Sequence, residues 1–168
     1  MNEKRSLHLF YFRITDIWKR FCEEHSELLD KTFEEYSLLL SSDIDALEPL
    51  LQEKADVVQR ISFLEKARAR CIEELNEYLT EQGVKTIDSI SELIQVMKDY
   101  EEHNNEKHLF RFNQLLIDII EKIQEQNKKN QLFLNRSINS LREIREDALG
   151  VKNYNTYNNK GVSNSVNR

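Results

Sequence analysis

The scarcity of glycine and proline constrains this chain more than any other feature of its sequence. Only three of the 168 residues are glycine and one is proline, and before residue 150 these are Pro49 and Gly83. Sheet proteins depend on Gly and Pro at turn positions of special backbone geometry. A sandwich, a barrel or a doubly wound α/β fold would have to make nearly all its turns without them. The sequence therefore predicts an all-α fold.

Apolar residues recur at helical spacing along three long stretches. We expect helices over about residues 4–40, 46–82 and 105–147, with one short helix in the connector that spans about 84–104. Short links place neighbouring helices antiparallel. The expected architecture is an elongated up-down-up bundle of three long helices with one short connecting helix.

Local signals mark the expected helix ends. Asp43 lies in a polar break, where short side chains accept bonds from free N–H groups, and Pro49 suits the first turn of the second helix. Gly83 stands where a left-handed residue ends that helix. Ser89 and Glu92 have the spacing of a capping box, which predicts the start of the short helix.

The last nineteen residues differ from the rest of the chain. They contain six asparagines, no acidic residue and few aliphatic ones. Such a segment buries too little apolar area to offset the entropy lost on ordering. We expect a helical bundle domain over 1–149, followed by a flexible Asn-rich tail over 150–168 that has no regular structure of its own.

Composition excludes several classes of protein. There is no glycine-rich phosphate loop, and no apolar run approaches the roughly twenty residues that cross a bilayer. The N-terminus lacks the apolar segment of a secretory signal. The net charge of −6 argues against nucleic acid as a partner. We expect a cytoplasmic protein with no membrane insertion.

No constellation of residues for catalysis stands out. Carboxylates and lysines are spread over the faces that a charged helix exposes to water, and His103 and His108 do not share a helix face. A phosphotransfer histidine would be exposed, whereas His25 lies on an apolar seam. We therefore expect no enzyme activity, no catalytic residue, no metal site and no cofactor.

The two cysteines are expected to be free thiols. If the first two long helices are antiparallel about a turn near residue 42, Cys22 and Cys71 differ in height by about 12 Å. A disulfide needs Cα atoms within about 7 Å. Two buried free thiols also suit a reducing cytoplasm.

Polar residues interrupt the apolar seams at one level of the expected bundle. Asn127 and Asn130 replace apolar residues in the third long helix, and His25 with Gln59 or Asp56 falls at a similar height. One interpretation is a buried polar layer that fixes helix register. The other is that the asparagines mark where the core gives way to a stretch that binds a partner.

An apolar strip follows the two asparagines. It is more apolar than one packing seam requires, and it adjoins the tail. The residues that we expect to bind a partner are Leu134, Ile138, Leu141 and Ile144, with Tyr154 and Tyr157 in the tail. The alternative is that the third long helix packs against two neighbours.

Three segments resemble the FlgN-like flagellar export chaperones. One segment resembles the second helix of that family. It runs from Ser42-Asp43 through Ala46-Leu47 and Leu50 to Lys54, and continues with Leu64, Glu65 and Arg68. A second segment resembles the third helix of the family: Gln126-Asn127-x-x-Asn130, followed by Leu134, Ser137 and Leu141. The third segment, Tyr157 to Gly161, resembles the C-terminal Tyr-x-x-x-Gly signature. The order and spacing of the segments match over most of the chain from about residue 35.

The resemblance implies a function. Proteins of this family are small cytosolic chaperones that hold hook-associated (hook–filament junction) proteins by their helical C-terminal segments and deliver them to the flagellar type III export gate. They are not enzymes. The alternative is a coiled-coil adaptor or assembly protein without an export role. An uncovered apolar strip on the third long helix would favour the chaperone.

Overall fold

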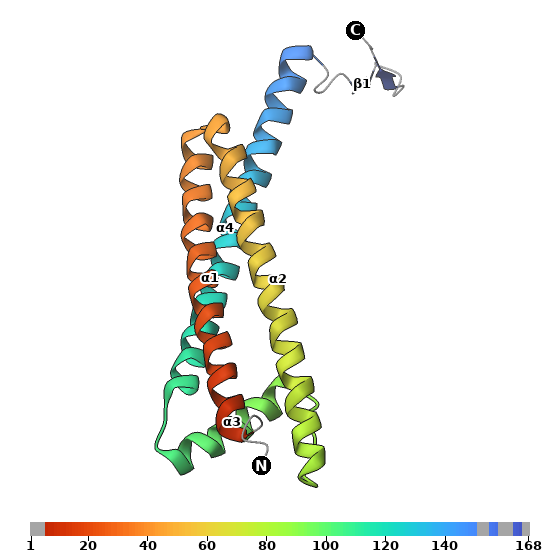
Figure 1. Ribbon diagram of the computed structural model, residues 1–168. Coiled ribbons are helices and arrows are strands. Elements are labelled where there is room, and N and C mark those ends of the chain that lie inside the picture. Colours follow the sequence, from red (N-terminus) through yellow and green to blue (C-terminus); the bar gives the residue numbers. More distant parts are fainter. Residues whose placement is uncertain (1–5, 151–154, 158–162, 166–168) are drawn as a thin grey trace. The chain divides into compact units, whose positions relative to one another are not determined.

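The structure, a computed structural model, describes residues 6–150, 155–157 and 163–165 of the chain. Three long helices, α1 (Leu7–Ser41), α2 (Ile44–Glu81) and α4 (His108–Leu149), and the short helix α3 (Ile90–Asn104) make up almost all of it (Figure 1). The prediction of an all-α bundle of three long helices and one short connecting helix is confirmed. The chain divides into two compact units, residues 1–127 and 128–168.

Side-chain caps fix the helix starts, as the sequence predicts. Asp43 accepts a bond from the N–H of Ala46 at 3.1 Å, and Ser89 accepts one from Glu92 at 3.1 Å. The carboxylate of Glu92 reaches back to the N–H of Asp88, one residue before the cap, at 2.8 Å. The start of α3 is thus held by a slightly displaced capping box.

All four helices are followed by a residue in the left-handed backbone region, and after α4 this residue is Gly150, with φ 65°. Gly83 has φ +70° and nothing lies within 4 Å of where its Cβ would be, so the backbone angle alone explains the glycine. Ser42 and Asn105 take the same conformation with φ of 56° and 54°. The chain therefore makes two of these turns without glycine.

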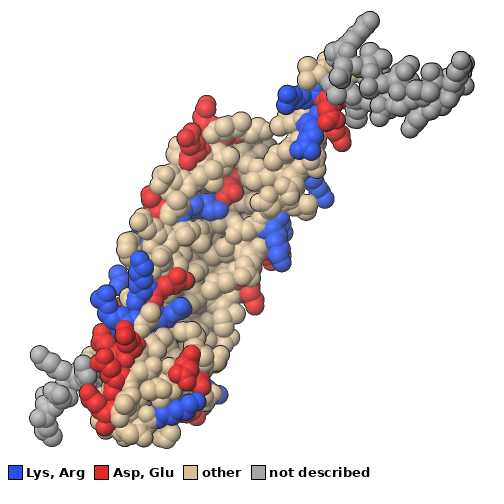
Figure 2. Space-filling model, turned by 90° about the vertical axis from the view of Figure 1, so that its right-hand side faces the viewer, with Lys and Arg blue, Asp and Glu red and all other residues tan. Residues whose placement is uncertain are grey.

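The first two helices form an antiparallel hairpin held by ion pairs. Four inter-helix ion-pair sets connect them: Arg13–Glu74, Lys31–Glu53, Lys54–Glu35, and Arg60 with Glu24 and Glu27. All agree within about one turn with the register expected for a turn near residue 42. Figure 2 shows basic and acidic side chains interleaved on one face of the molecule.

The core of unit 1–127 is richest in aromatic residues on α1. Phe10, Tyr11, Trp18 and Phe21 are at most 2% exposed and pack with apolar residues of α2 and α3. The indole N–H of Trp18 donates to Asn113 at 3.0 Å. Further along α1, Cys22 packs against Ile119 and Ile123 of α4. The first part of α4 therefore runs parallel to α1, and the up-down-up order holds within this unit.

A buried carboxylate joins three helices. Glu101 of α3 is 4% exposed, and its Oε1 accepts bonds from the Tyr11 hydroxyl of α1 at 2.8 Å and from the N–H of Leu109 at 2.7 Å. A longer bond of 3.4 Å comes from the N–H of Phe110. Because Leu109 and Phe110 lie in the first turn of α4, Glu101 caps that helix from a distance in sequence.

Both cysteines are free and buried, so the prediction of no disulfide is confirmed. Burial raises the pKa of the Cys22 thiol to about 11 and raises the pKa of Cys71 as well. Thiolate, the reactive form, is therefore disfavoured at both positions.

Regular structure occurs in the tail, contrary to the prediction. Strands β1 (Asn155–Tyr157) and β2 (Ser163–Ser165) pair antiparallel, with Thr156 opposite Asn164. Backbone pairing needs no apolar side chains, and composition does not reveal it. The other tail residues after Gly150 lie outside the described residues. Within the described part of the chain, no helix is long and apolar enough to span a membrane.

Replacing Glu101 by alanine should lower the free energy of unfolding by about 3 kcal/mol, because buried donors lose their acceptor. Glu101→Gln retains an acceptor oxygen and should lose about 1 kcal/mol, as should Tyr11→Phe, which removes one donor. Urea unfolding followed by circular dichroism measures all three. Equal losses for Glu101→Ala and Glu101→Gln would show that the carboxylate does not cap α4.

Alkaline pH should weaken the same junction. Burial, and then the bond and charge of Glu101, raise the pKa of Tyr11 to about 12 from an ordinary value of 10.0. The folded state prefers neutral tyrosine, so this stabilisation is complete below pH 10 and is lost as pH rises through about 12. Urea titrations from pH 8 to 12 should show a steeper decline for the parent than for Tyr11→Phe. Parallel declines would contradict the assignment.

Candidate partner-binding site

The C-terminal half of α4 carries an exposed apolar strip. Ile138 is 51% exposed, Leu141 66% and Ile144 64%, while Leu134 is half-buried. These four residues, which we call the apolar strip, recur every three or four positions and so lie on one side of the helix. Exposure of the strip is what the sequence predicts for a partner-binding surface.

The strip continues the row of α4 residues that packs into the core earlier in the helix. Ile119 and Ile123 are buried against Cys22. Ile144 belongs to the same heptad row as Ile123 and Asn130. One apolar face thus runs along α4, buried in its first half and exposed in its second.

Charge around the strip is balanced. Residues 134–149 contain three basic and three acidic residues. Arg142, Glu143 and Arg145 all lie next to strip residues in sequence, so charge alone gives this half of α4 no strong preference for a partner.

Of the two tail tyrosines that we expect to bind a partner, the structure describes only the backbone of Tyr157. Tyr154 lies outside the described residues. Tyr157 is the last residue of β1, where its backbone is opposite Ser163. Their role in binding stays a prediction.

The predicted polar layer fails at two of its four positions. The side chains of Gln59 and Asn127 are exposed, as is that of Asp56, and a register layer needs buried groups. Asn130 is 3% exposed, and Nδ1 of the half-buried His25 donates to the Phe21 carbonyl of its own helix at 2.7 Å. The buried row of α4 residues includes Gln126, which is 5% exposed, and does not include Asn127.

This error has a simple geometric cause. Buried residues of α4 follow the spacing Ile119, Ile123, Gln126 and Asn130, which alternates four and three. The sequence prediction took both heptad rows as buried, so it included Asn127. Gln126 has a long polar side chain, which is typical of a surface position, so the sequence gave no sign that it is buried in the core.

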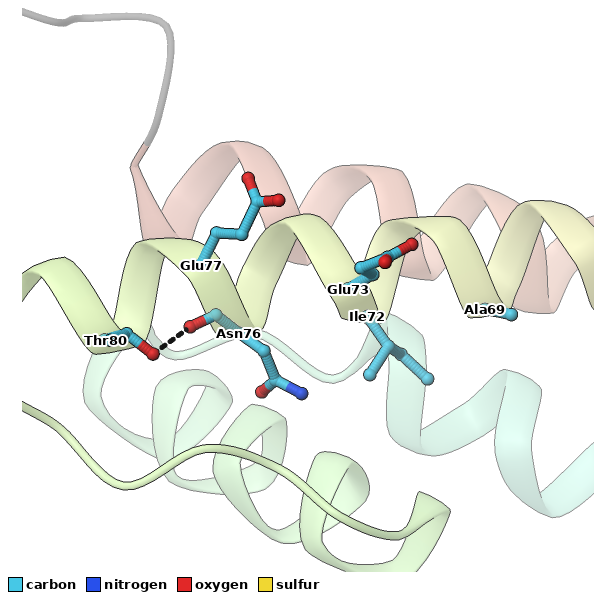
Figure 3. A pocket seen from close by; sticks show the side chains of 6 residues that line it. All are labelled: Ala69, Ile72, Glu73, Asn76, Glu77 and Thr80. Atoms are coloured by element: carbon cyan, nitrogen blue, oxygen red, sulfur yellow. Dashed lines mark hydrogen bonds between the residues drawn. The ribbon is translucent and has the colours of Figure 1, made fainter.

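The surface also has an open depression over α2 (Figure 3). It is lined by Ala69, Ile72, Glu73, Asn76, Glu77 and Thr80. Asn76 is held in place, since its amide donates to the Ile87 carbonyl and accepts from the Ile87 N–H at 2.8 and 2.7 Å. Asn76 thus anchors the connector to α2. Among the described residues no group of His, Cys, Asp and Glu could hold a metal ion.

Comparison with known proteins gives one match. A family model described as FlgN protein matches residues 11–165, which is nearly the whole chain. No curated protein and no solved structure matches the chain.

Polar substitution of the strip should leave the fold intact. Because Ile138 and Leu141 are largely exposed, the double variant Ile138→Gln/Leu141→Gln should change the free energy of unfolding by less than about 0.5 kcal/mol. Ile123→Gln, on the buried half of the same face, should cost about 3 kcal/mol. Thermal and urea unfolding compare the two. Similar losses would mean that the strip is part of the core.

Proposed function

Since the chain belongs to the FlgN family of flagellar export chaperones, we propose that it holds hook-associated proteins in the cytoplasm and delivers them to the flagellar type III export apparatus. Family membership supports the general role, and the exposed strip on α4 supports a site for the client, meaning the exported protein. The protein acts by binding, as members of this family are chaperones and not enzymes.

The exposed apolar strip is the observation that carries this proposal. Ile138, Leu141 and Ile144 each expose more than half of their surface on one side of a helix. Leaving such a face in water is unfavourable by about 25 cal/mol per Å² relative to burial. An apolar helical segment of a client can cover it by helix-to-helix packing.

The same chemistry explains why a client would need a chaperone. A terminal helix that packs against its neighbours only in the assembled hook–filament junction exposes its apolar face beforehand. Covering that face prevents self-association. Delivery requires release, which favours a binding surface of modest size, and a strip of four residues is modest.

Handover to the export gate is the second part of the proposed function. The tail adjoins the strip in sequence and contains Tyr157 and Gly161, which resemble the C-terminal signature of the family. We assign contact with gate components to this tail, so that the client and the gate engage neighbouring stretches of the chain.

A coiled-coil adaptor with no export role is the competing function. A self-contained structural bundle would cover its apolar seams, whereas the second half of α4 exposes five large aliphatic residues, of which Ile138, Leu141 and Ile144 belong to the strip. This exposure favours the chaperone.

The decisive experiment replaces apolar strip residues by acidic ones. Ile138→Asp/Leu141→Asp should weaken binding of a hook-associated client about a hundredfold or more, because two apolar anchors are lost and charges are buried. Leu132→Asp is the matched control: Leu132 is 51% exposed but lies on the opposite side of α4. Calorimetry with the purified client and each full-length variant measures affinity.

Circular dichroism establishes that each variant is folded. Unchanged affinity of a folded Ile138→Asp/Leu141→Asp variant would place the client site elsewhere. Equal loss in the Leu132→Asp control would mean that the charge, and not the strip, is responsible.

A further inference from the structure

A second exposed apolar surface lies at the tip of the α1–α2 hairpin. It consists of two residues of α1 and three of α2, which we call the hairpin patch: Phe33, Leu40, Ile44, Leu51 and Val58. They are 50%, 54%, 75%, 46% and 52% exposed, respectively. On both helices the members are spaced by seven residues, which is the spacing of a packing seam and not of scattered surface residues.

On each helix of the hairpin, the patch residues share one side. Leu40 lies about five helical turns from Cys22, on the same side of α1, and Cys22 packs against α4. Val58 lies about five turns from Asn76, on the same side of α2, and Asn76 bonds to the connector that leads to α3. On each helix the patch therefore continues, toward the hairpin tip, a side that another part of unit 1–127 contacts further down.

The charge around the patch is strongly acidic. Residues 30–60 contain eight acidic and three basic residues. All three basic side chains, Lys31, Lys54 and Arg60, are neutralised in ion pairs with acidic residues of the hairpin. Asp45 and Glu48 line a surface depression together with Leu51. The hairpin tip thus combines an apolar seam with excess negative charge.

We propose that the hairpin patch docks an amphipathic helix of a partner protein whose apolar face is flanked by lysine and arginine. Apolar contacts to the heptad-spaced residues supply affinity. The acidic surroundings select basic flanks and exclude acidic ones. The hairpin patch shares no residue with the apolar strip of α4, where basic and acidic residues are balanced, so the two surfaces differ in the charge that they would select.

A synthetic peptide of about 20 residues, long enough to be helical, tests the proposal. It carries leucine every third or fourth position and lysine elsewhere, and a second peptide has glutamate in place of each lysine. Fluorescence anisotropy with the full-length protein measures both. The basic peptide should bind at least tenfold more tightly, and binding should weaken as salt rises to about 0.5 M.

Two variants locate the binding. Leu51→Gln/Val58→Gln should reduce affinity for the basic peptide at least tenfold, with unfolding midpoints unchanged because both side chains are about half exposed. Phe63→Gln is the matched control, since Phe63 is 58% exposed on a different side of α2 and should bind normally. Ile138→Asp/Leu141→Asp should also bind normally, so this test is independent of the client site.

Several results would overturn the proposal. Equal binding of the acidic peptide would remove the charge argument, and undiminished binding by Leu51→Gln/Val58→Gln would remove the site. A large fall in the unfolding midpoint of that variant would mean that the patch packs within the chain. Self-association that the same variant abolishes, measured by sedimentation, would make a second copy the occupant.

Discussion

The bonds to Glu101 are the interaction on which the packing of α1, α3 and the start of α4 depends. A charged side chain in a protein interior is tolerated only where its hydrogen bonds are supplied, and Tyr11 and the first turn of α4 supply them here. The carboxylate thereby ties the start of α4 to α1 and α3.

Along that face of α4 the chain changes from core to surface without changing its spacing. Ile119 and Ile123 are buried, Gln126 and Asn130 are buried but polar, and the apolar strip beyond them is exposed. Burial of Gln126 and Asn130 requires that their polar atoms be hydrogen-bonded, because an unsatisfied buried polar group is costly. In the proposed client site, the strip is already helical before a partner arrives, which lowers the entropic cost of binding.

Two basic residues in the apolar seam of α2 show how the hairpin tolerates charge. Lys54 is paired with Glu35, and both side chains are less than one-fifth exposed, which makes this pair less screened by salt than those at the surface. The half-buried Arg68 places its guanidinium 5.4 Å from the centre of the Phe21 ring, so its charge lies over an aromatic face. These contacts add specificity to the alignment of α1 and α2, which the apolar residues alone would leave free to slide.

Helical periodicity, N-cap chemistry and the length of a tight turn are local properties, so the helices, the caps at Asp43 and Ser89 and the register of α1 against α2 could be predicted from the residues alone. The strip could be predicted as well, because Leu134, Ile138, Leu141 and Ile144 keep helical spacing on the α4 face that continues past the asparagines. Which polar residues are buried could not be predicted in this way. Gln126 and Asn130 enter the seam and Asn127 does not, and Glu101 is taken into the core, because burial depends on contacts between helices far apart in sequence.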